Sequence, residues 1–123
     1  MITIRPEAPS DYEATEQITI AAFSGKPYSD QTEHFVIRRL REAKALSLSL
    51  VAEIGETIVG HIAFSVVKIN GEDKQWYGLG PVSVLPAFQK QGIGSALIKE
   101  GLVRIRGLDA KGCVLEGNPD YYQ

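Results

Sequence analysis

The spacing of apolar residues changes near residue 48, and this change constrains the fold more than any other feature of the sequence. Before it, apolar side chains such as Ala14, Ile18 and Ala22 recur every three or four residues, which is the period of an amphipathic helix. After it, residues 48–85 are rich in β-branched side chains, which are typical of strands. The sequence therefore predicts an α/β domain in which helices pack on a mixed sheet.

Turn and capping residues divide the chain into separate elements. We expect strands over residues 2–5, 48–54, 57–69, 75–85 and 113–116, helices starting after residues 11 and 30, and a helix from residue 93 to about residue 107. Asn70-Gly71 predicts a tight hairpin turn, and Asn118-Pro119 is typical of a helix start. The expected order is β-α-α-β-β-β-α-β-(α). It fills a single domain over residues 1–123, because this length suits one core and not two.

The charge balance argues against nucleic acid or an anionic membrane as a partner. The chain has 13 basic and 15 acidic side chains and a net charge of −2, so it carries no overall positive field. The densest basic cluster consists of Arg38, Arg39, Arg41 and Lys44. It falls on the second predicted helix, whose apolar stripe we expect at Val36, Leu40 and Ala43. We interpret the cluster as a solvated helix face.

Cysteine usage and the N-terminus indicate a reducing, cytoplasmic setting. Cys113 is the one cysteine, so no internal disulfide forms, and no Cys/His spacing typical of zinc sites occurs. The first residues show no signal segment, and no apolar stretch is long enough to span a membrane. We expect no metal and no membrane partner, and Cys113 reads as a buried strand thiol.

The segment that carries chemistry joins the last strand before residue 86 to the helix after residue 92. Pro81 inside the strand predicts a bulge or a splayed edge, because proline cannot donate a ladder hydrogen bond. Gly92 and Gly94 then open an amphipathic helix, whose free N–H groups and positive dipole end attract anions. Glycines at such a turn let the backbone approach a phosphate, and Gln89 and Lys90 add donors and charge. The sequence therefore predicts a phosphate site here.

Two established glycine loops do not fit this segment. A Walker-type loop requires a lysine between the last glycine and the hydroxyl residue, and Ser95 directly follows Gly94. A dinucleotide fingerprint requires a third glycine where this chain has Leu97.

A third pattern matches. Gln89-x-x-Gly92-x-Gly94, preceded by residues 82–86, resembles the acetyl-CoA motif of the GNAT superfamily of N-acetyltransferases, and the segment from Asn118 to Tyr122 resembles the superfamily's next element. The resemblance covers almost the whole chain. It implies the acyl-CoA N-acyltransferase fold, acetyl-CoA as the acyl donor, and an amine acceptor that is a small molecule or a peptide.

The resemblance also implies roles for individual residues. Backbone groups of Val82 and Val84, on either side of Ser83, would pair with the pantetheine amides, and Asn118 would contact the pantetheine arm. The pyrophosphate would be held by the loop of Gln89, Lys90, Gln91, Gly92, Ile93, Gly94 and Ser95. A tyrosine just beyond Asn118 would reach the cofactor sulfur.

The proton donors and acceptors of the transfer step are candidates rather than motif residues. Tyr122, and next Tyr121, are candidate acids for the leaving sulfur, since a phenol is neutral at physiological pH yet donates; either ring could instead simply pack. His61 is the candidate base, with a suitable ordinary pKa, although a strand histidine among apolar neighbours is also typical of a core. Glu53 and Glu116 are further candidates. By resemblance, residues 25–30 would form a lid on the acceptor side.

The chain departs from the family at its end. The family continues through a helix and two further strands, whereas this sequence stops at Gln123, so we expect a fold lacking its last two strands. Either the sequence is a fragment, or a partner subunit supplies the missing wall of the acceptor site. The strand Cys113–Glu116 would be an open edge that a second copy could pair with, which predicts a homo-oligomer. Two other functions remain open: a non-catalytic acyl-CoA-binding or sensing module, and a structural remnant that binds nothing.

Overall fold

The computed structural model describes residues 2–26, 32–42, 46–69, 72–107 and 112–115. Its strands are β1 (Ile2–Pro6), β2 (Leu46–Ile54), β3 (Thr57–Ile69), β4 (Glu72–Val84) and β5 (Gly112–Leu115). Its helices are α1 (Tyr12–Phe23), α2 (Glu33–Glu42) and α3 (Ile93–Arg106), with short 3-10 turns at Pro9–Asp11 and Pro86–Phe88. The predicted order is confirmed through β5, and the helix start expected at Asn118 lies outside the described residues.

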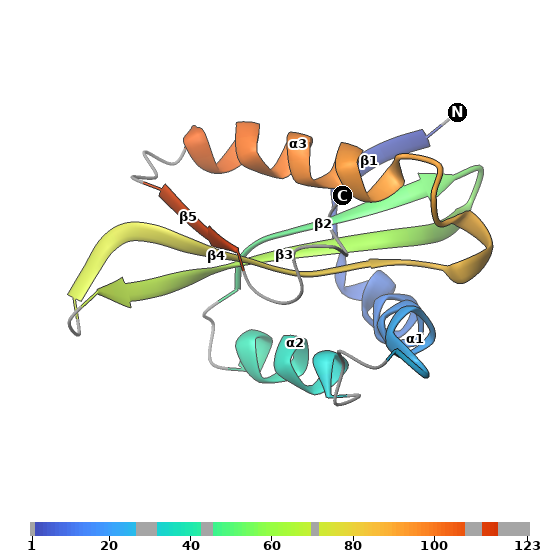
Figure 1. The fold of residues 1–123 in the computed structure, drawn as a ribbon, viewed down its shortest axis with the longest axis horizontal. Helices are drawn as coiled ribbons and strands as arrows, with labels where there is room; N and C mark the ends of the chain where they lie inside the picture. Colours follow the sequence, from blue (N-terminus) through green and yellow to red (C-terminus); the bar gives the residue numbers. More distant parts are fainter. Residues whose placement is uncertain (1, 27–31, 43–45, 70–71, 108–111, 116–123) are drawn as a thin grey trace.

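The strands form one mixed sheet in the order β1-β2-β3-β4-β5. Neighbours from β1 to β4 are antiparallel, and β5 runs parallel to β4. A parallel neighbour requires a crossover connection, which α3 supplies. Figure 1 shows α3 over one face of the sheet and both α1 and α2 over the other. This is the α/β, mixed-sheet class that the sequence predicts.

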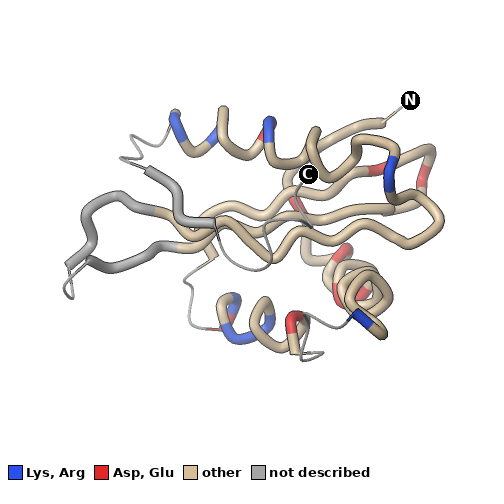
Figure 2. Tube along the Cα trace, viewed as in Figure 1, with Lys and Arg blue, Asp and Glu red and all other residues tan. Residues whose placement is uncertain are grey.

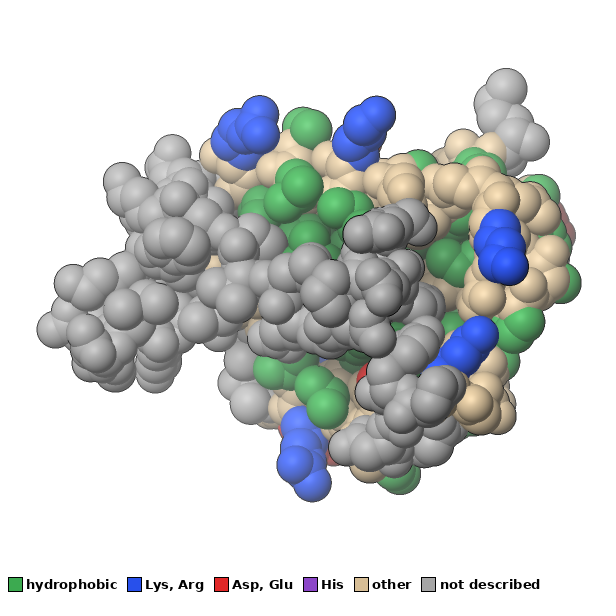
Figure 3. All heavy atoms as spheres, viewed as in Figure 1, with side chains coloured by type: hydrophobic (Ala, Val, Ile, Leu, Met, Phe, Trp, Pro, Cys, Tyr) green, Lys and Arg blue, Asp and Glu red, His purple; other side chains and the backbone are tan. Residues whose placement is uncertain are grey.

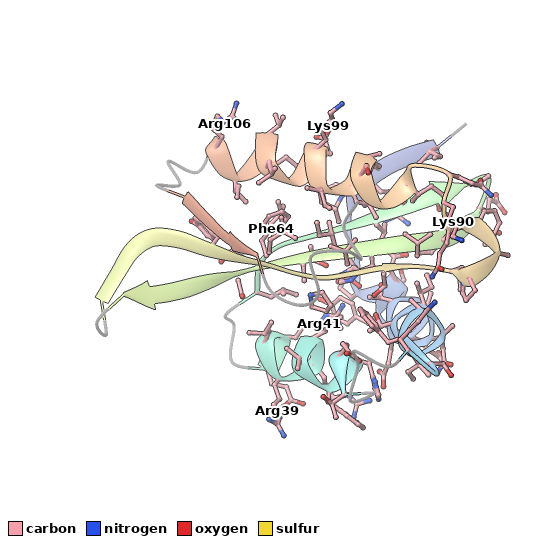
Figure 4. The ribbon with its side chains drawn as sticks, viewed as in Figure 1. Arg39, Arg41, Phe64, Lys90, Lys99 and Arg106 are labelled. Carbon is pink, nitrogen blue, oxygen red and sulfur yellow. The ribbon has the colours of Figure 1, made fainter. Side chains whose placement is uncertain are left out.

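The face beneath α3 is the apolar core. The side chains of Ile62 and Phe64 on β3 are fully buried there, and Phe64 points toward α3 (Figure 4). From α3, Ile93, Leu97 and Ile105 pack down onto them. Their spacing of four and eight residues keeps them on one side of the helix. This burial fixes where α3 begins.

The face beneath α1 and α2 carries polar groups in its interior. Its buried side chains include Thr15, Thr19, His61, Ser65 and Ser83. The Ser83 hydroxyl donates to the Thr19 hydroxyl of α1 over 3.3 Å, so Ser83 faces α1. His61 lies directly opposite Ser83 in the β3–β4 register, and cross-strand partners share a face. His61 therefore also lies beneath the helices.

The predicted apolar stripe of α2 is wrong at Val36, whereas Leu40 is partly buried as expected. Val36 is 43% exposed, and the buried residue is Ile37 at 2%; Ala43 lies outside the described residues. One turn after Ile37, Arg41 points from α2 toward the sheet (Figure 4), where its guanidinium pairs with the Glu7 carboxylate. The basic cluster is accordingly not a uniformly solvated face. Apolar spacing predicts that an arginine lies on the outer face of a helix. Arg41 lies on the inner face of α2 because the buried Glu7 carboxylate pairs with it.

Charges of both signs are spread over the described parts of the molecule. Figure 2 shows basic and acidic residues interspersed along the trace. On the face drawn in Figure 3, the basic side chains lie apart over α3, the β4–α3 loop, the end of α1 and α2. Among the described residues no helix is long and apolar enough to span a bilayer. The same part of the chain contains no group of three or more His, Cys, Asp or Glu side chains placed to hold a metal.

The close packing of α3 on β3 predicts an unusual response to a glycine substitution. A Cβ built on Gly101 would lie 2.3 Å from Cε1 of the Phe64 ring, which is fully buried and has no room to move. Gly101→Ala should therefore lower the free energy of unfolding by about 1–3 kcal/mol, although glycine to alanine in a helix normally raises it by about 0.5–1 kcal/mol. Urea unfolding measures the change. The double variant with Phe64→Leu should recover part of the loss, and no recovery would contradict the collision.

Candidate functional site

The bulge predicted from Pro81 is present in β4. Ile62 pairs with Val82 and Phe64 pairs with Leu79, so Ala63 alone faces both Gly80 and Pro81. A bulge of this kind bends the strand and changes its course relative to its neighbour. Beyond it, the pairing between β4 and β5 recorded in the described residues ends at Leu79 with Leu115. From residue 80 to residue 84, the described chain places no strand against that edge of β4.

The unpaired edge of β4 presents the backbone groups of Val82 and Val84. The Leu85 N–H donates to the Val59 carbonyl on β3 over 2.9 Å. Since alternate residues of a strand direct their backbone groups to opposite edges, those of Val84 and Val82 face away from β3. The side chains of Val82, Ser83 and Val84 are 1%, 0% and 5% exposed. A ligand at this edge therefore meets main-chain N–H and C=O groups rather than side chains.

The start of α3 is built as an anion site. Gly92 precedes the helix with a φ of +84° and Lys90 has a φ of +63°, a left-handed conformation that glycine adopts without strain. The Ala96 N–H donates to the Gly92 carbonyl over 3.0 Å, which is the first bond of the helix. The N–H groups of residues 93–95 precede it and so have no helical acceptor. Lys90 is exposed in the same loop (Figure 4).

The strand edge and the helix start lie side by side. A Cβ built on Gly94 would lie 3.9 Å from side-chain carbons of both Val82 and Val84. Ile93, just before Gly94, is 1% exposed and anchors this end of α3 in the core. One extended ligand carrying amides and a diphosphate could therefore reach both sets of backbone groups at once.

Gln89 is engaged differently from the expected role. Its side-chain amide donates to the Val84 carbonyl over 2.9 Å, which braces the loop against the end of β4. The motif glutamine thus acts on the shape of the loop, while the exposed Lys90, Gln91 and Ser95 remain at its surface. The sequence motif assigns the Gln89 side chain to the ligand. The motif alone cannot reveal that this side chain bonds to the Val84 carbonyl.

His61 belongs to a buried polar cluster. Its side chain is 0% exposed, its Nε2 lies 2.6 Å from the Ser49 Oγ, and the same nitrogen is 3.9 Å from the Glu7 carboxylate. Burial lowers the pKa of His61 to about 4; the Glu7 charge opposes this decrease and the Arg41 charge adds to it. The imidazole is therefore neutral at physiological pH, one strand away from the open edge of β4.

Glu7 is the charged centre of that cluster, and the sequence did not reveal it. Its side chain is 2% exposed. It accepts hydrogen bonds from Arg41 Nη2 at 2.5 and 2.6 Å and from the Ser49 hydroxyl at 2.8 Å. Burial alone would raise the pKa of Glu7, but His61, Arg41 and the hydroxyl donors together lower it. No motif marks Glu7, since its environment arises only when β1, α2 and β2 meet.

Of the remaining candidate site residues, the structure describes Glu53 but not those near the C-terminus. Glu53 is held by Arg5 over 3.4 Å, and Arg5 also binds Asp11 at 2.8 Å. This ion-pair group fixes the entry to α1, so Glu53 has a partner other than His61. Asn118, Tyr121, Tyr122 and Glu116 lie outside the described residues, as does most of the expected lid.

Comparisons with known proteins identify the family. A sequence profile described as the acetyltransferase (GNAT) family matches residues 12–120. The chain belongs to this family. It is 33% identical over 120 residues to the uncharacterized N-acetyltransferase YhbS of Escherichia coli K12, which covers 97% of the chain and 69% of YhbS.

Solved structures of GNAT proteins share the fold. A GNAT family acetyltransferase from Brucella melitensis, in complex with acetyl-CoA, is 55% identical with a TM-score of 0.94; the match covers 99% of this chain and 79% of that one. Escherichia coli YhbS in complex with CoA is 33% identical with a TM-score of 0.81, over 98% of this chain and 65% of YhbS. The fold is therefore the acyl-CoA N-acyltransferase fold, as the resemblance implied.

The buried imidazole predicts a pH dependence of stability. The pKa of His61 falls from 6.5 to about 4 on folding, so between these values the unfolded chain binds a proton that the folded chain does not. The contribution of His61 to the free energy of unfolding should be fully present above pH 6.5. It should decrease toward pH 4 by up to about 1.4 kcal/mol per pH unit. Urea unfolding of wild type and His61→Gln across this range measures it. Parallel profiles for the two proteins would show that His61 does not cause the decrease.

Proposed function

We propose that this GNAT domain transfers the acetyl group of acetyl-CoA to a primary amine by direct attack. The supporting observation is that two sets of backbone groups lie close together: the β4 edge at Val82 and Val84, and the helix start at residues 93–95. Neither set is paired with a strand or helical acceptor in the described residues, although the Gln89 side chain donates to the Val84 carbonyl. An extended thioester that ends in a pyrophosphate matches this pair of sites. The similar Brucella and Escherichia coli structures hold acetyl-CoA and CoA.

In this proposal the main chain of the protein does the binding. Val82 and Val84 pair with the pantetheine amides as an added strand would. The N–H groups of residues 91–95, of which those of residues 93–95 have no helical acceptor, hold the pyrophosphate with the positive end of α3. Lys90 supplies an exposed positive charge. Asn118 contacts the pantetheine arm. Backbone donors suit this task because their directions are fixed by the sheet and the helix.

The chemical step requires one proton acceptor and one proton donor. The acceptor nitrogen must be neutral to attack the thioester carbonyl, and it loses a proton as the C–N bond forms; His61 is the proposed base. The C–S bond then breaks, and Tyr122, or Tyr121 in its place, donates a proton to the departing sulfur. General acid–base groups of this kind contribute about 10²–10⁴-fold to a rate.

A test of the function follows the release of free thiol from acetyl-CoA in the presence of a broad amine panel. We expect turnover with at least one small-molecule or peptide amine, and the acetylated product confirmed by mass. Binding of acetyl-CoA by calorimetry without turnover across the panel would favour the non-catalytic acyl-CoA-binding module. Absence of both binding and turnover would reject both functions.

The left-handed glycine of the loop predicts a loss of affinity. Gly92→Ala forces a Cβ into a φ of +84°, which costs about 1–2 kcal/mol and moves the amides that the pyrophosphate requires. We expect the Kd for acetyl-CoA to rise at least tenfold by calorimetry. Gly55→Ala is the matched control, since Gly55 also has a positive φ, of +63°, and open space around it, but lies in the β2–β3 turn. An equal loss of affinity in both variants would contradict the loop assignment.

The candidate acid predicts a change in rate without a change in binding. Tyr122→Phe should lower kcat by roughly 10²-fold, the lower end for general acid catalysis, and leave the Kd for acetyl-CoA within twofold of wild type. Tyr121→Phe serves as the comparison. If Tyr121→Phe alone loses activity, the role passes to Tyr121, and if neither variant does, a tyrosine acid is rejected.

A further inference from the structure

Three side chains from separate segments form a partly buried chain of contacts. Glu7 follows β1, Ser49 lies on β2 and His61 lies on β3. The Ser49 Oγ is 2.8 Å from the Glu7 Oε1 and 2.6 Å from the His61 Nε2. The hydroxyl therefore bridges a carboxylate and an imidazole that are themselves 3.9 Å apart at their nearest atoms.

Counting hydrogens assigns the direction of these bonds. A hydroxyl carries one hydrogen, and an ionised carboxylate only accepts. Arg41 binds Glu7 through two contacts, which keeps the carboxylate charged. A hydrogen bond to a charged acceptor is roughly twice as strong as a neutral one, so the Ser49 hydrogen points to Glu7. The Ser49 oxygen then accepts the hydrogen of His61 Nε2.

This assignment leaves His61 Nδ1 as an unprotonated acceptor. The atom is buried and has no hydrogen-bond partner among the described residues. The two ring nitrogens are not adjacent in the imidazole, so with Nε2 directed to β2, Nδ1 lies on the side of the ring away from β2. On that side are α1 and β4, where Ser83 pairs with His61. A buried acceptor without a partner costs about 1–3 kcal/mol, and a structural histidine would normally avoid it.

We propose that Glu7 and Ser49 are positioning residues that hold His61 in the Nε2–H tautomer, so that Nδ1 is the atom that accepts the proton of the attacking amine. This inference rests on the proposed function. As the N–H bond of the amine breaks, the Nδ1–H bond forms, and the imidazolium is stabilised through Ser49 by the Glu7 carboxylate. The proton then passes to solvent after the product leaves. Arg41 keeps Glu7 ionised between turnovers.

The tautomer can be observed directly and without any substrate. Nitrogen-15 NMR of the wild-type chain, labelled at its two histidines, should show His61 with a protonated Nε2 and an unprotonated Nδ1 at pH 7. The His61→Gln variant assigns the resonances by their loss. Ser49→Ala should shift His61 toward the other tautomer, whereas Ser49→Thr, which keeps the hydroxyl on a strand, should preserve the wild-type spectrum. A protonated Nδ1 in the wild type overturns the inference whatever the activity.

Kinetics on the same variants tests the catalytic consequence. With an amine that the wild type acetylates, Ser49→Ala should lose at least tenfold in kcat with the KM for acetyl-CoA within twofold, and Ser49→Thr should restore most of it. Wild-type kcat in Ser49→Ala, or a loss confined to the KM, would overturn the inference and leave the proposed function standing. A wild type that acetylates no amine rejects the proposed function, and this inference with it. Calorimetry with acetyl-CoA shows that each variant is folded.

Discussion

Strand β4 combines buried side chains with a free backbone edge, and the positions of β5 and α3 relate to this combination. Its side chains at residues 82–84 lie in the interior, while one backbone edge of the same residues stays free of strand pairing in the described chain. The bulge at Gly80 and Pro81 reconciles the two. In the described residues, β4 pairs with β5 before the bulge, and no pairing with β5 is recorded after it. The packing of Gly94 against Val82 and Val84 then sets the helix start beside the free edge.

The two faces of the sheet are held by different forces. Beneath α3 the contacts are apolar and close, as the approach of Gly101 to Phe64 shows. Beneath α1 and α2 they include hydroxyls, a neutral imidazole and an ion pair between the buried Glu7 carboxylate and the partly buried Arg41. Burying such polar groups costs free energy unless they bind one another. Their hydrogen bonds therefore fix the orientation of the side chains on this face as well as their burial.

The sequence predicted those features that depend on neighbours in the chain. The strand limits of β3, the bulge from Pro81 and the glycine turn into α3 are local patterns, and each was confirmed. The inner face of α2 was not predicted, because the residue that makes Arg41 acceptable inside is Glu7, which is distant in sequence. The bond from Gln89 to Val84 was missed for a related reason, since a motif states which residue is present and not which atom it binds. The roles of Tyr121, Tyr122 and Asn118 stay predictions.

The pairing of Glu7 with Arg41 has a consequence for how this family can vary. Among the described residues of α2, Ile37 is fully buried and Arg41 pairs with Glu7. Loss of Arg41 would leave the Glu7 carboxylate, which is 2% exposed, without its cationic partner, and removing one partner of a buried pair is strongly destabilising. Related sequences should therefore exchange positions 7 and 41 together, and a lineage that replaced both with apolar residues would keep the helix but lose the charge beside Ser49.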